Sequence, residues 1–116
     1  MSALVEWLGH GGEPVDHGIA EYRASVCRGC PLNAHGKWWE TSKSLIAESI
    51  RKILELKNHR QIFVSNEENL FMCGACGCAL RLKVHAPIEH IRNNMPFSQA
   101  EKLDPGCWIP REISEL

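Results

Sequence analysis

The spacing of hydrophobic residues predicts one long helix in the middle of the chain. Within SKSLIAESIRKILELK, residues 42–57, apolar side chains recur at intervals of three and four. This spacing gathers them on one face of an α-helix, and such a face packs against the rest of a protein. We expect Thr41 or Ser42 to cap the start of this helix. Its predicted apolar stripe consists of Ile46, Ile50, Ile53 and Leu54.

Two shorter helices are predicted nearer the N-terminus. Residues 2–8 have room for one or two helical turns before the segment GHGGEP interrupts them. Asp16 can cap a second helix through HGIAEYRASV, because a carboxylate accepts hydrogen bonds from the N–H groups of a first turn. We expect an irregular loop over LNAHGKWWE, residues 32–40.

A strand is predicted near the end of the cysteine-rich segment. In ALRLKV, residues 79–84, Leu80, Leu82 and Val84 alternate with Arg81 and Lys83. This alternation is typical of a strand that buries one face and exposes the other. The segment QIFV predicts a further short strand, and PIEHIRNN predicts a short helix because proline suits a first helical position.

Composition indicates a small single domain that needs support beyond its hydrophobic core. The chain has 116 residues, of which 44% are hydrophobic, together with nine glycines and six prolines. Cores of this size are often stabilised by a metal or by disulfides. We expect residues 1–18 to form an N-terminal arm and residues 19–116 to form one metal-binding domain.

Charge and the N-terminal sequence bear on where the protein acts. The net charge of −1 provides no overall attraction for nucleic acid or an acidic membrane. The start of the chain has no basic stretch and no long apolar run, so we expect neither secretion nor a membrane partner. In a reducing cytoplasm, cysteines serve more often as metal ligands than as disulfides.

The spacing of the six cysteines predicts a metal site. Cys27 and Cys30 form one C-x2-C turn, Cys73 and Cys76 form a second, and Cys78 and Cys107 follow them. Two such turns, distant in sequence, can close a tetrahedral site of four thiolates around Zn²⁺. Our first ligand set is therefore Cys27, Cys30, Cys73 and Cys76, with Cys78 and Cys107 either substituting for one of these or packing as small apolar residues.

An iron–sulfur cluster is the alternative to zinc. The closely spaced Cys73, Cys76 and Cys78, together with Cys107, can supply the four thiolates that a [4Fe–4S] cluster needs. In either case the thiolates carry negative charge, which Arg28, Arg81 or Lys83 can offset. The fold class expected from these features is small α+β, with zinc-ribbon-like knuckles, one long amphipathic helix and short strands.

The sequence predicts no enzyme. The dithiol segment CGAC is similar to a thioredoxin motif, but it precedes a predicted strand and lacks the βαβ pattern that such a motif requires. None of the six histidines stands in an HExxH motif, and no glycine-rich phosphate loop is present.

A binding role is therefore expected, with two alternatives for the partner. Tryptophan is enriched among the anchors of protein interfaces, so Trp38 and Trp39 in the predicted loop are candidate partner-binding residues. Nucleic acid is the alternative partner, because RK at 51–52, KNHR at 57–60 and RLKVH at 81–85 can merge into one basic face.

The cysteine segments also resemble a known group of proteins. The order CRGCPLN, then CGACGCALRLKVHAPIEHI, then GCW resembles small cysteine-rich proteins of tailed bacteriophages and prophages, over roughly residues 20–108. The resemblance implies a metal and a phage context, with the protein in the host cytoplasm during infection or incorporated in the virion, and with other virion proteins as partners. It implies no reaction.

Overall fold

The computed structural model describes residues 2–34, 37–75 and 79–116, with the backbone alone for residues 2, 34 and 37–45. In these ranges 57% of the chain is helical and 4% is strand. The longer helices are α1 (Ser2–Gly9), α2 (His17–Arg28) and α3 (Lys37–Asn58). The two strands, β1 (Asn33–Ala34) and β2 (Met72–Cys73), have two residues each. The shorter helices are a 3₁₀ turn (Glu67–Asn69), α4 (Leu80–Lys83), α5 (Ile88–Asn93), α6 (Phe97–Ala100) and α7 (Trp108–Ser114).

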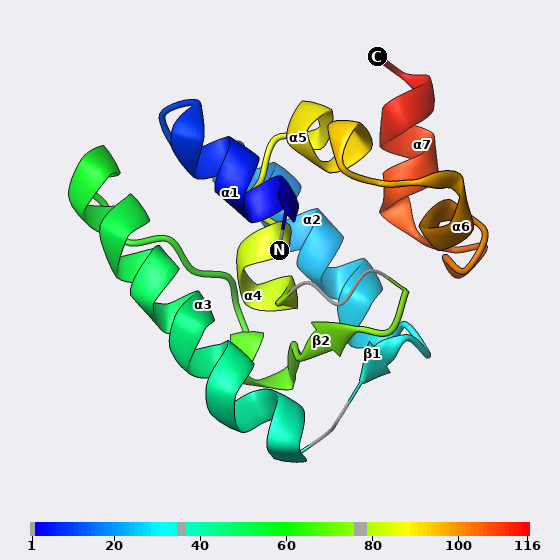
Figure 1. Ribbon diagram of the computed structural model, residues 1–116, viewed down its shortest axis with the longest axis horizontal. Helices are drawn as coiled ribbons and strands as arrows, with labels where there is room; N and C mark the ends of the chain where they lie inside the picture. Colours follow the sequence, from blue (N-terminus) through cyan, green and yellow to red (C-terminus); the bar gives the residue numbers. More distant parts are fainter. Residues whose placement is uncertain (1, 35–36, 76–78) are drawn as a thin grey trace.

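The predicted α+β, zinc-ribbon-like fold is wrong, because the described residues are mostly helical. Their strand content is limited to the two-residue pair β1–β2 and an isolated bridge between Met72 and Ala79. Figure 1 shows α3 along one flank of the molecule and α5, α6 and α7 along the opposite flank, with α4 between them.

The prediction of a strand over ALRLKV, residues 79–84, is also wrong. This segment forms the helical turn α4 instead of a strand, and Leu80, Leu82, Lys83 and Val84 are all buried. An alternating strand would have exposed Lys83, whereas this turn lies in the middle of the protein, between α2 and α3. Packing on all sides has therefore overridden the local preference of the sequence.

The two longest helices, α2 and α3, lie where the sequence predicts helices, but α3 does not begin at the predicted Thr41 or Ser42 cap. Asp16 caps α2 by accepting a hydrogen bond of 2.9 Å from the Gly18 N–H. Helix α3 begins at Lys37, earlier than predicted, so Trp38 and Trp39 belong to its first turn and not to a loop. Its stripe is divided, since Ile50 and Leu54 are buried while Ile46 and Ile53 are half exposed.

Helix α1 joins the same core. Leu4 and Trp7 of the expected N-terminal arm are buried, and α1 packs against α5. The turn after α1 depends on Gly12, which has a φ of +69°. L side chains rarely adopt this φ, and a Cβ at this position would lie 2.6 Å from Leu54 Cδ2, so a larger residue would strain the turn and displace the Leu54 side chain.

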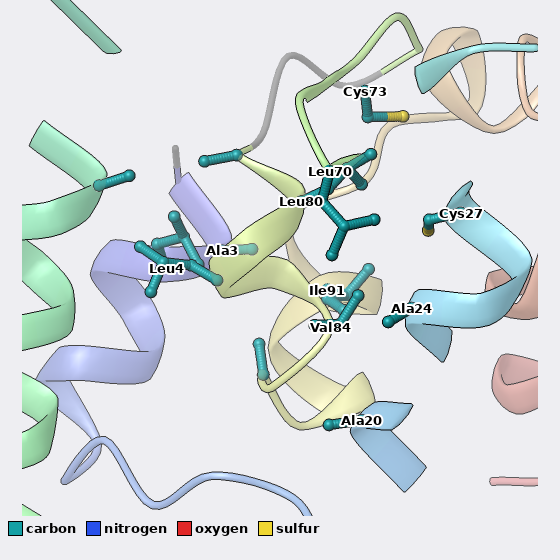
Figure 2. Packing of buried hydrophobic residues seen from close by; sticks show 14 of the residues in the cluster. Ala3, Leu4, Ala20, Ala24, Cys27, Leu70, Cys73, Leu80, Val84 and Ile91 are labelled. Atoms are coloured by element: carbon teal, nitrogen blue, oxygen red, sulfur yellow. The ribbon is translucent and has the colours of Figure 1, made fainter. Parts of the chain in front are cut away.

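Figure 2 shows the buried cluster around α4, with Cys27 and Cys73 at its edge beside Leu80. Within the described ranges, no helix is long and apolar enough to cross a membrane.

Candidate metal centre

Four cysteines from three separate segments line one small cavity. They are Cys27 in the last turn of α2, Cys30 just beyond it, Cys73 in β2 and Cys107 immediately before α7. The cavity has a volume of about 20 Å³. None of the four cysteines is in a disulfide. The structure thus brings residues of the first C-x2-C turn, the second C-x2-C turn and the C-terminal GCW segment to one place.

Short backbone contacts position these thiols. The Cys30 N–H donates to the Cys27 carbonyl at 3.1 Å, which closes the first C-x2-C turn. In the β1–β2 pair, Asn33 lies opposite Cys73, so the second cysteine segment is held beside the first. A turn in which the Cys107 N–H donates to the Asp104 carbonyl at 2.9 Å brings in the third segment.

The buried side chain of Asn33 stabilises this junction. Its Nδ2 donates to the Asn69 carbonyl at 2.7 Å, and its Oδ1 accepts from the Phe71 N–H at 2.8 Å. Because both ends of the amide are satisfied, the strand pair can be buried without a polar penalty. Asn33 therefore fixes the chain that leads into Cys73.

The environment of Cys27 disfavours a bare thiolate. Burial raises the pKa of its thiol to about 11, a hydrogen bond from Trp108 acts in the opposite direction, and Cys107 and Cys30 add smaller upward effects. Lys83 favours the thiolate through its positive charge. A cation entering the cavity would remove the cost of ionising this sulfur, since metal binding deprotonates thiols.

Lys83 supplies positive charge at the cavity. This residue of α4 is buried and lines the cavity. The two other cations expected near the metal are engaged elsewhere, because Arg28 donates to the Ser65 carbonyl at 2.7 Å and Arg81 donates to the Leu70 carbonyl at 3.0 Å. A four-thiolate zinc centre has a net charge of about −2, which a neighbouring ammonium partly offsets.

The size of the cavity is consistent with one bound ion. A volume of about 20 Å³ is close to that of one water-sized sphere. Such a space suits a single ion. In the part of the chain that the structure describes, no three His, Cys, Asp or Glu side chains stand in a preset metal-binding arrangement. Thiols that line this cavity must therefore turn toward an ion to bind it.

Several predicted site residues cannot be placed. Cys76, in our first ligand set, and its possible substitute Cys78 lie outside the described residues. The side chains of Trp38 and Trp39 also lie outside them. Among the described cysteines, Cys107 lines the same cavity as Cys27, Cys30 and Cys73.

Sequence reasoning missed two residues beside the thiols. The indole N–H of Trp108 donates to Cys27 Sγ at 3.2 Å. The guanidinium of Arg23 lies 4.3 Å from the centre of the Trp108 ring and also bonds to Glu112. The adjacency of Cys107 and Trp108 in the segment GCW was the available signal for Trp108. No comparable signal marked Arg23, whose contacts come from distant parts of the chain.

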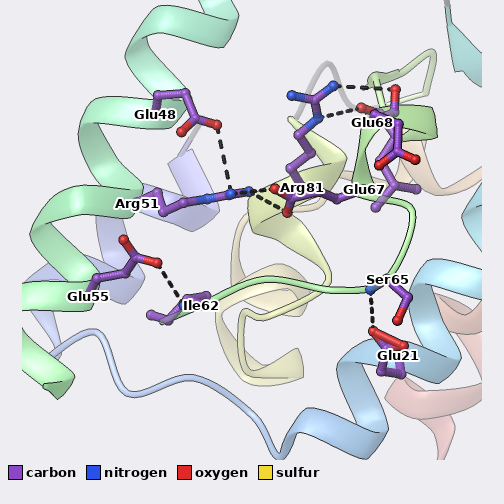
Figure 3. A network of polar contacts seen from close by, with 10 residues as sticks. Glu21, Glu48, Arg51, Glu55, Ile62, Ser65, Glu67, Glu68 and Arg81 are labelled. Atoms are coloured by element: carbon purple, nitrogen blue, oxygen red, sulfur yellow. Dashed lines mark hydrogen bonds and ion pairs between the residues drawn. The ribbon is translucent and has the colours of Figure 1, made fainter. Parts of the chain in front are cut away.

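Part of the predicted basic face is buried, whereas Lys52, Lys57 and Arg60 remain exposed. Arg51, Lys83 and His85 are buried, and Arg51 makes two hydrogen bonds to Glu67, at 2.7 and 2.8 Å. Figure 3 shows this pair joining α3 to the segment before β2, with Arg81 directed at backbone carbonyls nearby. The buried Arg51 and Lys83 are therefore not accessible to a phosphate backbone.

Comparisons of the chain with family models, with curated proteins and with solved structures found no match.

Proposed function

We propose that this chain is a small structural zinc protein, in which one Zn²⁺ is held by Cys27, Cys30, Cys73 and Cys107. The observation that carries the proposal is the convergence of these four thiols, from three segments, on a cavity sized for one ion. Zinc accepts four thiolates at about 2.3 Å in tetrahedral geometry. Bound zinc would supply a crosslink, and the chain's own residues would hold and shield it.

Each part of the cavity has a defined task in this proposal. The C-x2-C turn presents two sulfurs, β2 presents the third and the segment before α7 presents the fourth. Leu80 and Ile109 exclude water from the site, and the Lys83 ammonium offsets part of the thiolate charge. This ligand set replaces Cys76 of the first set with Cys107.

The ligand set is tested by single serine substitutions analysed for bound zinc. Cys27→Ser, Cys30→Ser, Cys73→Ser and Cys107→Ser should each lose most of the bound zinc, because removing one ligand opens a closed site. Cys78→Ser is the matched control, and Cys76→Ser distinguishes the two ligand sets. Zinc retained in Cys107→Ser and lost in Cys76→Ser would contradict Cys107 as the fourth ligand.

The biological role that we propose is protein binding in a phage context, as a virion component or an accessory protein. Its support is the resemblance of the cysteine segments together with exposed apolar side chains on α3. Ile46 and Ile53 are each 49% exposed, and Leu56 is 76% exposed. They lie seven and three residues apart, which places them on one side of the helix. We retain Trp38 and Trp39, in the first turn of the same helix, as further candidate anchors.

The two alternative functions are not supported by a specific observation. Burial of Arg51 and Lys83 removes two cations from the predicted nucleic-acid face. Two of the four cysteines predicted for an iron–sulfur cluster, Cys76 and Cys78, lie outside the described residues, so no contact of the structure supports that cluster. We therefore propose neither.

A further inference from the structure

Trp108 is placed so that its indole N–H must find its acceptor inside the protein. The residue is 2% exposed. A buried N–H without a partner is destabilising, so native structures supply one. Here the acceptor is Cys27 Sγ at 3.2 Å, across the wall of the thiol cavity.

The orientation of the ring is fixed from its other side. Arg23 is 1% exposed and lies over the Trp108 ring. Its Nη1 donates to the Val84 and Ala86 carbonyls at 3.0 and 2.7 Å, and its Nε donates to Glu112 at 3.0 Å. With these bonds Arg23 cannot move away, so the indole is held with its N–H directed at Cys27.

The chemistry of sulfur shows which state of Cys27 this contact serves. A neutral thiol is a weak hydrogen-bond acceptor. A thiolate accepts a stronger, charge-assisted bond, and ligand sulfurs in metal sites are commonly stabilised by such donors. The indole N–H of Trp108 is therefore directed at a sulfur that accepts a strong hydrogen bond only when the sulfur is ionised.

We infer that Trp108 is a positioning residue for the metal centre, which donates an N–H···S hydrogen bond to Cys27 as a metal-bound thiolate and so strengthens metal binding. This inference rests on the proposed function. It assigns to the C-terminal GCW segment two roles, a ligand from Cys107 and a donor from Trp108. The Arg23 contact extends the support of the site to α2 and α7.

The first test is metal affinity in Trp108→Phe, which keeps an aromatic ring and removes the N–H. Its dissociation constant for Zn²⁺, measured by competition with a chromophoric chelator, should rise about tenfold or more, as losses of outer hydrogen bonds to metal ligands do. The matched control is Trp7→Phe. Trp7 is also buried, and its indole N–H donates to the Glu13 carbonyl at 2.9 Å, away from the thiols. This control should bind zinc within about twofold of wild type, because it alters no contact to a ligand sulfur.

The second test uses the wild-type chain and does not depend on a variant that folds. In protein loaded with ¹¹³Cd²⁺, a hydrogen bond to a ligand sulfur transmits a scalar coupling between the indole proton and the metal. We expect this coupling for Trp108 and none for Trp7.

The two tests distinguish the role of Trp108 from the presence of a metal site. A wild-type chain that binds no metal would overturn the proposed function. A chain that binds metal, with no coupling at Trp108 and unchanged affinity in Trp108→Phe, would overturn the positioning role alone.

Discussion

At the scale of single residues, buried arginine side chains hold distant segments of the chain together. Arg23 bonds to two carbonyls and one carboxylate, and Arg51 bonds to Glu67 through both terminal nitrogens. Each guanidinium ties together segments that are distant in the chain. Removing one partner from such a buried pair leaves an uncompensated charge, which costs more than the pair contributes. These residues therefore specify which segments lie next to each other.

His85 is the buried residue that should respond to pH. It is 3% exposed, and burial, followed by the charge of Arg51, lowers its pKa to about 4. Glu67 acts in the opposite direction, while His17 and Arg60 add smaller downward effects. The neutral imidazole is therefore the form that the fold accepts. Its Nε2 has no hydrogen-bond partner among the described residues.

We predict that stability falls as the pH is lowered through the window set by His85. Between pH 6.5 and 4 the unfolded chain takes up a proton that the folded chain does not, so the free energy of unfolding decreases with falling pH. The full effect is about 3 kcal/mol, and it is absent above pH 6.5. Urea unfolding of wild type and His85→Phe at several pH values measures it. Zinc release in acid affects both proteins, so parallel curves would show that His85 makes no contribution.

At the scale of elements, α3 combines a buried face with an exposed apolar one. Ile50 is 9% exposed, whereas Ile53, less than one turn away, is 49% exposed. The sequence shows both as members of one stripe. The stripe is wider than the surface that the rest of the protein offers, so part of it stays in water.

Aspartate substitutions distinguish the two faces. Ile50→Asp should lower the free energy of unfolding by roughly 3–5 kcal/mol, because it buries an unpaired charge. Ile53→Asp should change it by less than about 1 kcal/mol, as exposed substitutions do. Urea unfolding with zinc present provides the comparison. If Ile53→Asp proved as destabilising as Ile50→Asp, the exposed face of α3 would belong to the core and not to a partner surface.

Some helices and some of the cavity cysteines could be predicted from the sequence, and others could not. Helices α2 and α3 follow from a capping aspartate and a helical repeat, both of which act within a few residues. The segment ALRLKV was predicted incorrectly because its alternation fits a strand, while its surroundings bury every side chain from Leu82 to Ala86. In the site, the C-x2-C spacing pointed to Cys27, Cys30 and Cys73. The place of Cys107 depends on how α7 packs, which no local pattern contains.

At the scale of the whole molecule, the thiol cavity lies where four parts of the fold meet. It joins the end of α2, the β1–β2 pair, α4 and the start of α7. Of these elements α4 and α7 have only one or two turns, and helices of that length are unstable without tertiary support. An ion at this point would hold together segments that the modest core alone holds weakly.

The most direct test of the proposed metal centre is to measure the zinc content of the purified chain and then its helical circular dichroism as a chelator removes the metal. We predict one zinc per chain and a large loss of helical signal on chelation, reversed by adding zinc, because the binding energy of a structural metal is folding energy. A chain that contains no zinc after purification under reducing conditions, and whose helical signal and unfolding midpoint are the same with and without chelator, would contradict the metal centre.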